Sequence, residues 1–314
     1  MKKISIVVPC FNEQETVNIY FDAMTKMRLQ ANKDVEKFQI EYWFVDDGSS
    51  DQTLPTLKKL QQAHSDEVHY ISFSRNFGKE SALYAGLNAV TGDYIAVMDV
   101  DLQDPPDMLP TMFDILEQGE YDCVGSARED RKGENPIVSF FSNAFYGLIN
   151  KMSQTKIIPG ARDFRLMTRQ MVESIKSMTE YNRFSKGIFS WVGFKTKYLP
   201  YKNHERVAGT TSWNFWKLLK YALTGIIDFT ERPLAIATWF GSAFSLLSII
   251  AIIAIIVRKF INPFSSVNGW ASIVSVILLI GGIQLISIGI LGEYIGKIFL
   301  EVKRRPIYII KEKK

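Results

Sequence analysis

The sequence of 314 residues lacks the features that are typical of several common classes of protein. Residues 1–232 carry 28 Lys or Arg against 30 Asp or Glu and have no run rich in Lys or Arg, so the basic excess of the chain lies at its C-terminal end. A nucleic-acid-binding protein is therefore not expected. Charged residues make up 22% and hydrophobic residues 47% of the chain, which excludes a disordered protein. The length fits about two structural units.

Cysteine and histidine are scarce, with two and three residues. Cys10 and Cys123 each follow an apolar, strand-like run, and we expect them to be free, buried thiols. The histidines lack the spacing of metal ligands. No Gly-x-Gly-x-x-Gly follows the first predicted strand and no Walker lysine loop is present, so neither a nicotinamide-dependent enzyme nor a P-loop ATPase is expected.

Two long segments contain no charged side chain. They are residues 233–257 and 270–292, and as helices of 25 and 23 residues each would cover roughly 35 Å, enough to cross a bilayer. Buried helices of a large soluble core are the alternative. Arg258 and Lys259 are the two basic residues of the connection, whereas ten Lys or Arg flank the pair of segments on the other side. This asymmetry predicts two membrane spans with both ends of the chain in the cytoplasm.

The N-terminal 200 residues alternate between β-rich runs and helical patterns. The runs are residues 4–8, 41–45, 68–73, 94–98 and 121–125, and the helical stretches include 13–29 and 54–64. This alternation predicts an α/β domain with a mostly parallel sheet. Ligands of such sheets bind at the carboxyl ends of the strands, so the residues that follow each run are the candidates for a site.

Acidic residues follow the first, second and fourth of these runs. Clustered carboxylates repel one another unless a cation joins them, and a hard divalent ion with oxygen ligands is the usual solution. If the chain stays extended after the fourth run, Asp99, Asp101 and Gln103 share one face and present three oxygen ligands. This spacing predicts Mg²⁺ or Mn²⁺ bridged to a diphosphate, and a solvated turn is the alternative.

The ordered motifs resemble those of glycosyltransferase family 2. Within that family the similarity is to the polyprenyl-phosphate glycosyltransferases, the branch of the bactoprenol glucosyltransferases and dolichol-phosphate-mannose-synthase-like enzymes. The motifs lie at residues 6–13 (IVVPCFNE), 45–51 (VDDGSSD), 74–79 (SRNFGK), 98–106 (MDVDLQDPP), 163–167 (DFRLM) and 206–211 (RVAGTT). Together with the paired apolar segments they cover nearly the whole chain.

The resemblance implies a GT-A fold and a role for several residues. Pro9, Glu13 and Asp47 would line the pocket for the nucleotide base and ribose. Asp99 would lie by the sugar and diphosphate of the donor, with Asp101 and Gln103 as metal ligands. Asp163 matches the candidate base of relatives. Many relatives carry a lysine where this chain has Ser212, so an acceptor-phosphate role for that lysine does not transfer here.

The chemistry needs cations as well as a metal ion. Lys79 or Arg128 would neutralise the charge that develops on the departing diphosphate. Arginines suit the acceptor phosphate, and we expect Arg128, Arg131 and Arg206 to hold it. A lipid phosphate is already anionic near neutral pH, so a strong base is dispensable. Asp163 is therefore expected to orient the acceptor and the sugar, and a salt bridge with Arg162 or Arg165 is the alternative.

Four regions are expected. They are a cytosolic GT-A domain (1–211), an interfacial helix (212–232), a two-helix transmembrane hairpin (233–292) and a basic cytosolic tail (293–314). In the second region Trp213, Trp216 and Leu219 recur at helical spacing beside basic residues, as in helices that lie at a membrane surface, although an ordinary core helix has the same pattern.

The expected activity is metal-dependent, inverting transfer of a hexose from a UDP-sugar to undecaprenyl phosphate. Glucose is favoured, with N-acetylglucosamine next, for glycosylation of the cell wall or a surface polysaccharide. The partners are then a UDP-sugar, a polyprenyl phosphate and membrane lipids, without nucleic acid, and self-association stays open. The alternatives are a membrane-anchored phosphohydrolase and a non-enzymatic transporter of lipid-linked sugars.

Overall fold

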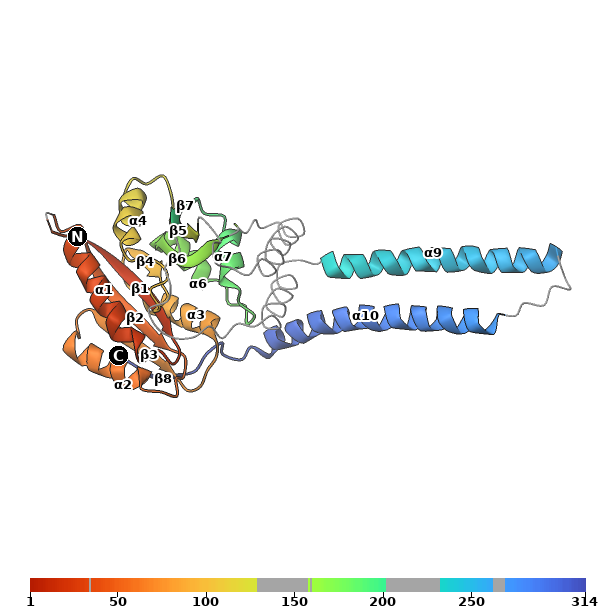
Figure 1. Cartoon of the computed structure of the whole chain (residues 1–314), viewed down its shortest axis with the longest axis horizontal. Coiled ribbons are helices and arrows are strands. Elements are labelled where there is room, and N and C mark those ends of the chain that lie inside the picture. Colours follow the sequence, from red (N-terminus) through yellow and green to blue (C-terminus); the bar gives the residue numbers. More distant parts are fainter. Residues whose placement is uncertain (34, 129–157, 159, 202–231, 262–268) are drawn as a thin grey trace. The chain divides into compact units, whose positions relative to one another are not determined.

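The computed structural model of the chain describes residues 1–33, 35–128, 158, 160–201, 232–261 and 269–314 (Figure 1). The chain divides into two compact units. The first joins Met1–Gly225 with Arg305–Lys314, and the second is Ile226–Arg304.

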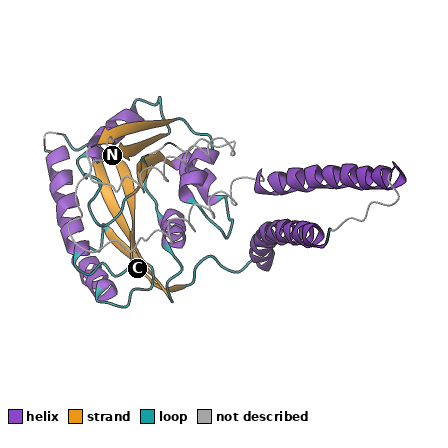
Figure 2. Cartoon of the chain, turned by 45° about the vertical axis from the view of Figure 1, so that its right-hand side comes forward, coloured by secondary structure: helices purple, strands orange, loops and turns teal. Residues whose placement is uncertain are grey.

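The first unit is built on one mixed sheet of eight strands, drawn in orange in Figure 2. Its order is β7-β5-β6-β4-β1-β2-β3-β8. The strands are β1 (Lys2–Cys10), β2 (Phe38–Asp46), β3 (Val68–Phe73), β4 (Tyr94–Val97), β5 (Cys123–Arg128), β6 (Ala161–Thr168), β7 (Thr196–Tyr201) and β8 (Ile310–Lys313).

Helices cover both faces of this sheet, and the strand residues alternate between the two layers. Ile4, Ile6 and Val8 of β1 belong to the core cluster that also contains side chains of α1 (Thr16–Ala31), α2 (Thr53–Ala63) and α4 (Met108–Glu117). On the other face Val7 meets α3 (Lys79–Ala89), where a Cβ on Gly86 would lie 2.2 Å from a methyl of Val7. Burial on both faces explains why these strands are apolar at nearly every position.

The strand directions bring the candidate residues to one edge. β1 is parallel to β2 and β4, β2 is parallel to β3, and β5 is parallel to β7. β6 runs antiparallel between β4 and β5, so its first residues lie at the edge where β4 and β5 end. The prediction of a mostly parallel α/β sheet is confirmed, and all five predicted runs form strands.

The C-terminal segment is a difference from the expected basic tail. β8 pairs antiparallel with β3, and the segment 305–314 belongs to the first unit. Within it Tyr308 stacks on Phe73, which gives this basic segment an apolar anchor.

The second unit contains two long helices, α9 (Arg232–Ile261) and α10 (Trp270–Lys303). Helix α10 runs past residue 292, where the apolar segment ends in sequence, and continues to Lys303. Among the described residues, Leu279–Lys303 is long and apolar enough to cross a membrane, and Leu285 and Ile286 are 71% and 66% exposed. Such exposure of apolar side chains indicates association with a membrane.

Candidate active site

A lysine joins two carboxylates at the carboxyl edge of the sheet. Lys79 begins α3, Asp99 follows β4, and Asp163 lies near the start of β6. The Nζ of Lys79 is 2.7 Å from Oδ1 of Asp99 and 2.6 Å from Oδ2 of Asp163. Val97 pairs with Arg165, and continuing that register by two residues brings Asp99 level with Asp163. The antiparallel insertion of β6 therefore creates this cluster.

The ammonium of Lys79 keeps its neighbours ionised. Burial alone would raise the pKa of Asp163, but Lys79, with a smaller contribution from Lys186, holds that pKa well below its ordinary value. The pKa of Lys79 is raised, because the two carboxylates outweigh its own burial. Asp163 is thus an anion at neutral pH and a weak proton acceptor.

The start of β6 is fixed by a buried arginine. The side chain of Arg165 is 3% exposed, and its guanidinium lies 3.8 Å from the ring centre of Phe189. It donates hydrogen bonds to the backbone carbonyls of Asp163 and Arg162, at 3.3 and 2.9 Å. Arg165 therefore binds the backbone at Asp163, whose carboxylate pairs with Lys79 rather than with Arg162 or Arg165.

A second element of the site is the donor loop, which we define as residues 74–79. Asp47, at the end of β2, accepts the backbone N–H of Phe77 at 2.6 Å and that of Gly78 at 2.9 Å. Burial raises the pKa of Asp47, whereas these two N–H groups lower it. Each carboxylate oxygen has a further lone pair for a ligand. Asp47 therefore fixes the backbone directly before Lys79.

Gly48 allows this approach of two loops. Its φ of +66° is strained for other residues, and a Cβ there would lie 2.4 Å from the carbonyl carbon of Arg75. Glycine is thus required where the loop after β2 touches the donor loop.

The expected extension of β4 through the acidic motif is wrong. β4 ends at Val97, the chain turns at Val100 and Asp101, and Leu102 has a φ of +54°. Asp101 is buried, and its Oδ1 accepts the N–H of Gln103 at 3.2 Å. Asp99, Asp101 and Gln103 therefore do not share one face of a strand, because β4 ends before all three of them.

Gln103 lies in a buried polar network. Its Oε1 accepts a hydrogen bond of 2.9 Å from Arg162, whose Nε is 3.6 Å from Asp104. Asp104 also accepts the hydroxyl of Tyr201 on β7. Burial raises the pKa of Asp104 while Arg162 lowers it. This network connects the acidic loop to β6 and β7.

The donors of the acidic loop are of the kind that Mg²⁺ and Mn²⁺ prefer. Carboxylate and amide oxygens of Asp101 and Gln103 follow one strand, and Asp99 is near by in sequence. Across the residues that the structure describes, no group of three His, Cys, Asp or Glu side chains is close enough to hold a metal ion. Water and the donor diphosphate would have to supply the remaining ligands, as is usual for Mg²⁺.

Other predicted residues lie at the same edge or outside the described part. Pro9 is near the end of β1, and the carboxylate of Glu13 accepts the hydroxyl of Thr16 at 2.6 Å. Arg128 ends β5 in register with Tyr201. Arg131, Arg206, Ser212 and the helix expected over 212–232 are outside the described residues.

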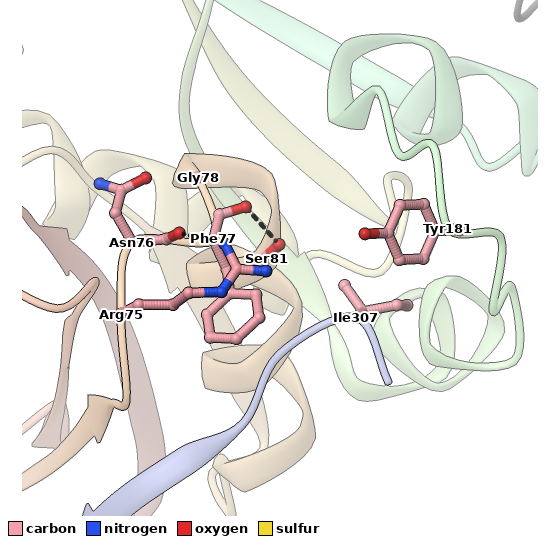
Figure 3. A pocket seen from close by; sticks show the side chains of 7 residues that line it. All are labelled: Arg75, Asn76, Phe77, Gly78, Ser81, Tyr181 and Ile307. Atoms are coloured by element: carbon pink, nitrogen blue, oxygen red, sulfur yellow. Dashed lines mark hydrogen bonds between the residues drawn. The ribbon is translucent and has the colours of Figure 1, made fainter. Parts of the chain in front are cut away.

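A pocket of about 260 Å³ opens beside the donor loop. It is lined by Arg75, Asn76, Phe77, Gly78, Ser81, Tyr181 and Ile307. Figure 3 shows Tyr181 and Ile307 across the pocket from Ser81 and Phe77. Sequence reasoning missed Ile307 because residues 305–314 read as a solvated basic tail. The β-branched run around it, Ile307-Tyr308-Ile309-Ile310, was the available signal for a strand.

This fold and this edge define the class of protein. A mixed, mostly parallel sheet carries acidic loops and a lysine at the carboxyl ends of its strands, and an apolar hairpin interrupts the unit. The domain is a GT-A glycosyltransferase domain.

Comparison with known proteins identifies the family. Residues 5–176 match the model of Glycosyl transferase family 2, and residues 232–298 match that of the GtrB C-terminal hairpin. The chain is 43% identical over 313 residues to the prophage bactoprenol glucosyl transferase homolog of Escherichia coli (strain K12), with 99% of each chain covered. It is also 43% identical over 315 residues to the bactoprenol glucosyl transferase of Shigella phage SfX, with 99% of this chain and 100% of the phage protein covered. The chain therefore belongs to glycosyl transferase family 2 and is a glycosyltransferase.

The comparison with solved structures gives matches of lower identity. The mannosyltransferase PcManGT from Pyrobaculum calidifontis, in complex with GDP-Man and Mn²⁺, aligns with a TM-score of 0.46 and 16% identity, over 94% of this chain and 87% of that one.

Proposed function

We propose that the protein transfers one glucose residue from UDP-glucose to undecaprenyl phosphate at the cytosolic face of the cell membrane, in support of cell-wall or surface-polysaccharide glycosylation. The observation that carries this proposal is the Lys79–Asp99–Asp163 cluster at the edge where nucleotide ligands bind in α/β sheets. The names of the Escherichia coli protein and the Shigella phage protein favour glucose as the sugar and bactoprenol as the carrier of the acceptor phosphate.

The donor is held by the ends of three neighbouring strands. Pro9, Glu13 and Asp47 would line the base and ribose, and Asp99, which pairs with Lys79, would lie beside the sugar and the diphosphate. Asp101 and Gln103 would hold Mg²⁺ or Mn²⁺, which neutralises charge on the departing diphosphate. Lys79 supplies a fixed positive charge in the same region, so the leaving group meets cations that need no reorganisation.

The reaction forms one bond and breaks one. An oxygen of the acceptor phosphate attacks the anomeric carbon, and the bond from that carbon to the diphosphate breaks, with its electron pair leaving on UDP. The anomeric configuration inverts. The acceptor phosphate is already ionised and carries no proton that must be removed. Asp163, with its lowered pKa, therefore serves to orient the sugar and the acceptor.

The acceptor phosphate needs cations of its own, and Arg128, Arg131 and Arg206 are assigned to it. Arg128 ends β5 at the same edge as Asp99 and Asp163. Guanidinium groups offer paired donors to phosphate oxygens.

The test is transfer of label into lipid. Membranes that contain the protein are incubated with UDP-glucose, UDP-N-acetylglucosamine or GDP-mannose, each labelled in the sugar, and with undecaprenyl phosphate. Label from UDP-glucose is expected in the lipid extract, and membranes with the Asp101→Ala variant serve as the control. Release of inorganic phosphate without labelled lipid would indicate the phosphohydrolase, and neither product would indicate the transporter.

The orientation of the hairpin is tested separately. Helices α9 and α10 are proposed to cross the membrane, with residues 262–268 on the outer side and both ends of the chain in the cytoplasm. Cys10 and Cys123 are buried, so an introduced cysteine at Ser265 or Lys314 is the reactive thiol. Labelling of intact cells by an impermeant maleimide at 265 but not at 314 is expected, and the reverse pattern would contradict the topology.

A further inference from the structure

The segment that follows the hairpin is fixed to the strand that leads into the donor loop. We define residues 305–314 as the return segment. The N–H of Ser74 donates to the carbonyl of Ile309 at 3.0 Å, and Tyr70 and Lys314 exchange two backbone hydrogen bonds of 2.8 and 3.0 Å. The side chains of Lys58 and Glu312 add an ion pair of 2.8 Å. The return segment therefore pairs with the chain from Tyr70 of β3 to Ser74, the first residue of the donor loop.

Tyr308 is the aromatic anchor of this segment. Its ring stacks on Phe73 with centroids 5.1 Å apart and an angle of 12° between the planes. It meets Tyr84 of α3 edge to face, at 6.2 Å and 70°. Tyr308 thus contacts both elements that flank the donor loop, the end of β3 before it and α3 after it.

The aromatic contacts continue into the donor loop itself. Phe73 meets Phe77 edge to face at 5.7 Å and 90°. The N–H of Phe77 is one of the two donors to Asp47, and Lys79 lies two residues further on. Three contacts, through Phe73 and Phe77, therefore link the Tyr308 ring to the carboxylate assigned to the nucleotide.

We propose that Tyr308 is a positioning residue for donor binding, and this inference rests on the proposed function. The ring does not touch the donor. It holds Phe73 and, through it, Phe77, so that the donor loop keeps its hydrogen bonds to Asp47 and holds Lys79 in its binding position before the nucleotide arrives. Without the ring the loop must be ordered during binding, and that cost weakens affinity for the donor. The same segment supplies Ile307 to the wall of the adjacent pocket (Figure 3).

The experiment compares three variants of the full chain in detergent. Tyr308→Ala removes the ring, Tyr308→Phe keeps it, and Ile309→Ala is the matched control. The side chain of Ile309 is 53% exposed, and alanine retains the backbone carbonyl that binds Ser74. The measurements are KM and kcat for UDP-glucose, Kd for UDP by calorimetry, and the temperature of unfolding.

Tyr308→Ala is expected to raise KM for UDP-glucose and Kd for UDP by about three- to tenfold, in the range of one or two lost aromatic contacts. Tyr308→Phe and Ile309→Ala should stay within about twofold of the wild type. A residue that only stabilised the fold would lower the temperature of unfolding and the fraction of active enzyme, and so the apparent kcat, without changing KM.

Two results would overturn the inference. One is an unchanged KM in Tyr308→Ala, whatever its unfolding temperature, and the other is an equal rise in Ile309→Ala. If Tyr308→Ala does not fold, Tyr308→Leu takes its place, since leucine keeps apolar bulk without a flat ring, and the same limits apply. A wild-type protein that neither binds UDP nor uses UDP-glucose would instead remove the proposed function, and this inference with it.

Discussion

Replacing Lys79 by methionine tests the centre of the site. The change keeps the length of the side chain and removes the charge between Asp99 and Asp163. Two short contacts are lost, of 2.7 and 2.6 Å. Burial raises the pKa of Asp163, and the ammonium of Lys79 is the main group that lowers it. Without that ammonium the pKa of Asp163 should rise above its ordinary value.

The rate effect follows from the type of interaction. Removal of one preorganised group that stabilises developing charge typically lowers kcat by about 10² to 10³. We expect Lys79→Met to fall in that range, because it removes a cation near the leaving diphosphate and also releases Asp99 and Asp163. Lys37→Met is the matched control, since Lys37 forms an exposed ion pair of 2.8 Å with Asp114. Such pairs contribute about 0 to 1 kcal/mol, and its kcat should not change.

The effect on stability has a sign that pH can check. In the wild type the pKa of Asp163 is lower in the folded protein than in the unfolded chain. The ionised Asp163 therefore makes its full contribution to the free energy of unfolding at pH 5 and above. In Lys79→Met the raised pKa makes the folded state bind the proton more tightly, so the variant gains stability as the pH falls from 7 to 5. The difference in unfolding temperature between wild type and variant should therefore narrow over that range. If the difference in unfolding temperature did not depend on pH, or if the kcat of Lys79→Met stayed within threefold of the wild type, the reasoning would be refuted.

Three further predictions concern other carboxylates. Excess chelator should abolish sugar transfer. Added Mg²⁺ or Mn²⁺ should restore transfer by the wild type but not by Asp101→Ala. Full turnover in excess chelator would contradict the metal assignment. Asp163→Asn should lower kcat while the pH-rate profile above about pH 7 keeps its shape; a wild-type acidic limb that vanishes in the variant would instead identify a base. Burial would raise the pKa of Glu41, but hydrogen bonds from Ser5, Lys3 and Thr91 lower it from 4.5 to about 2. The wild type should therefore lose about 3 kcal/mol of its free energy of unfolding as the pH falls from 4.5 to about 2. Glutamine does not titrate, so the free energy of unfolding of Glu41→Gln should not show this loss.

The parallel half of the sheet could be predicted from sequence because each strand is a short apolar run that ends in a polar loop. β1 and β3 are examples, with Val7 and Ile71 buried among apolar neighbours. The antiparallel strands could not be placed in the same way. Nothing in the residues of β6 indicates that it lies between β4 and β5, since that position depends on pairing with strands far away in the chain.

The motifs nominate the residues of the candidate site one by one, and those roles stay predictions, whereas the geometry of the site could not be predicted from sequence. The left-handed φ of Leu102 has no signal in the residue type, and together with the turn at Val100 and Asp101 it interrupts the extended backbone that a shared strand face would need. The contact of Lys79 with both Asp99 and Asp163 depends on two loops and an antiparallel strand that meet only in the folded domain. Spacing along the chain carries no information on such a meeting.

The position of β8 also fixes an order of events during synthesis. The hairpin helices α9 and α10 precede β8 in the chain, so both leave the ribosome before the sheet can receive its eighth strand. Until then the outer edge of β3 has unpaired N–H and C=O groups, the kind of edge that recruits strands from other chains. The sheet of a nascent chain is therefore incomplete while its hairpin is being synthesised, and a protein cut before residue 305 lacks the strand that covers this edge. Excision of the hairpin, with the return segment rejoined to the domain, keeps the residues of β8 in the chain, whereas truncation before residue 305 removes them.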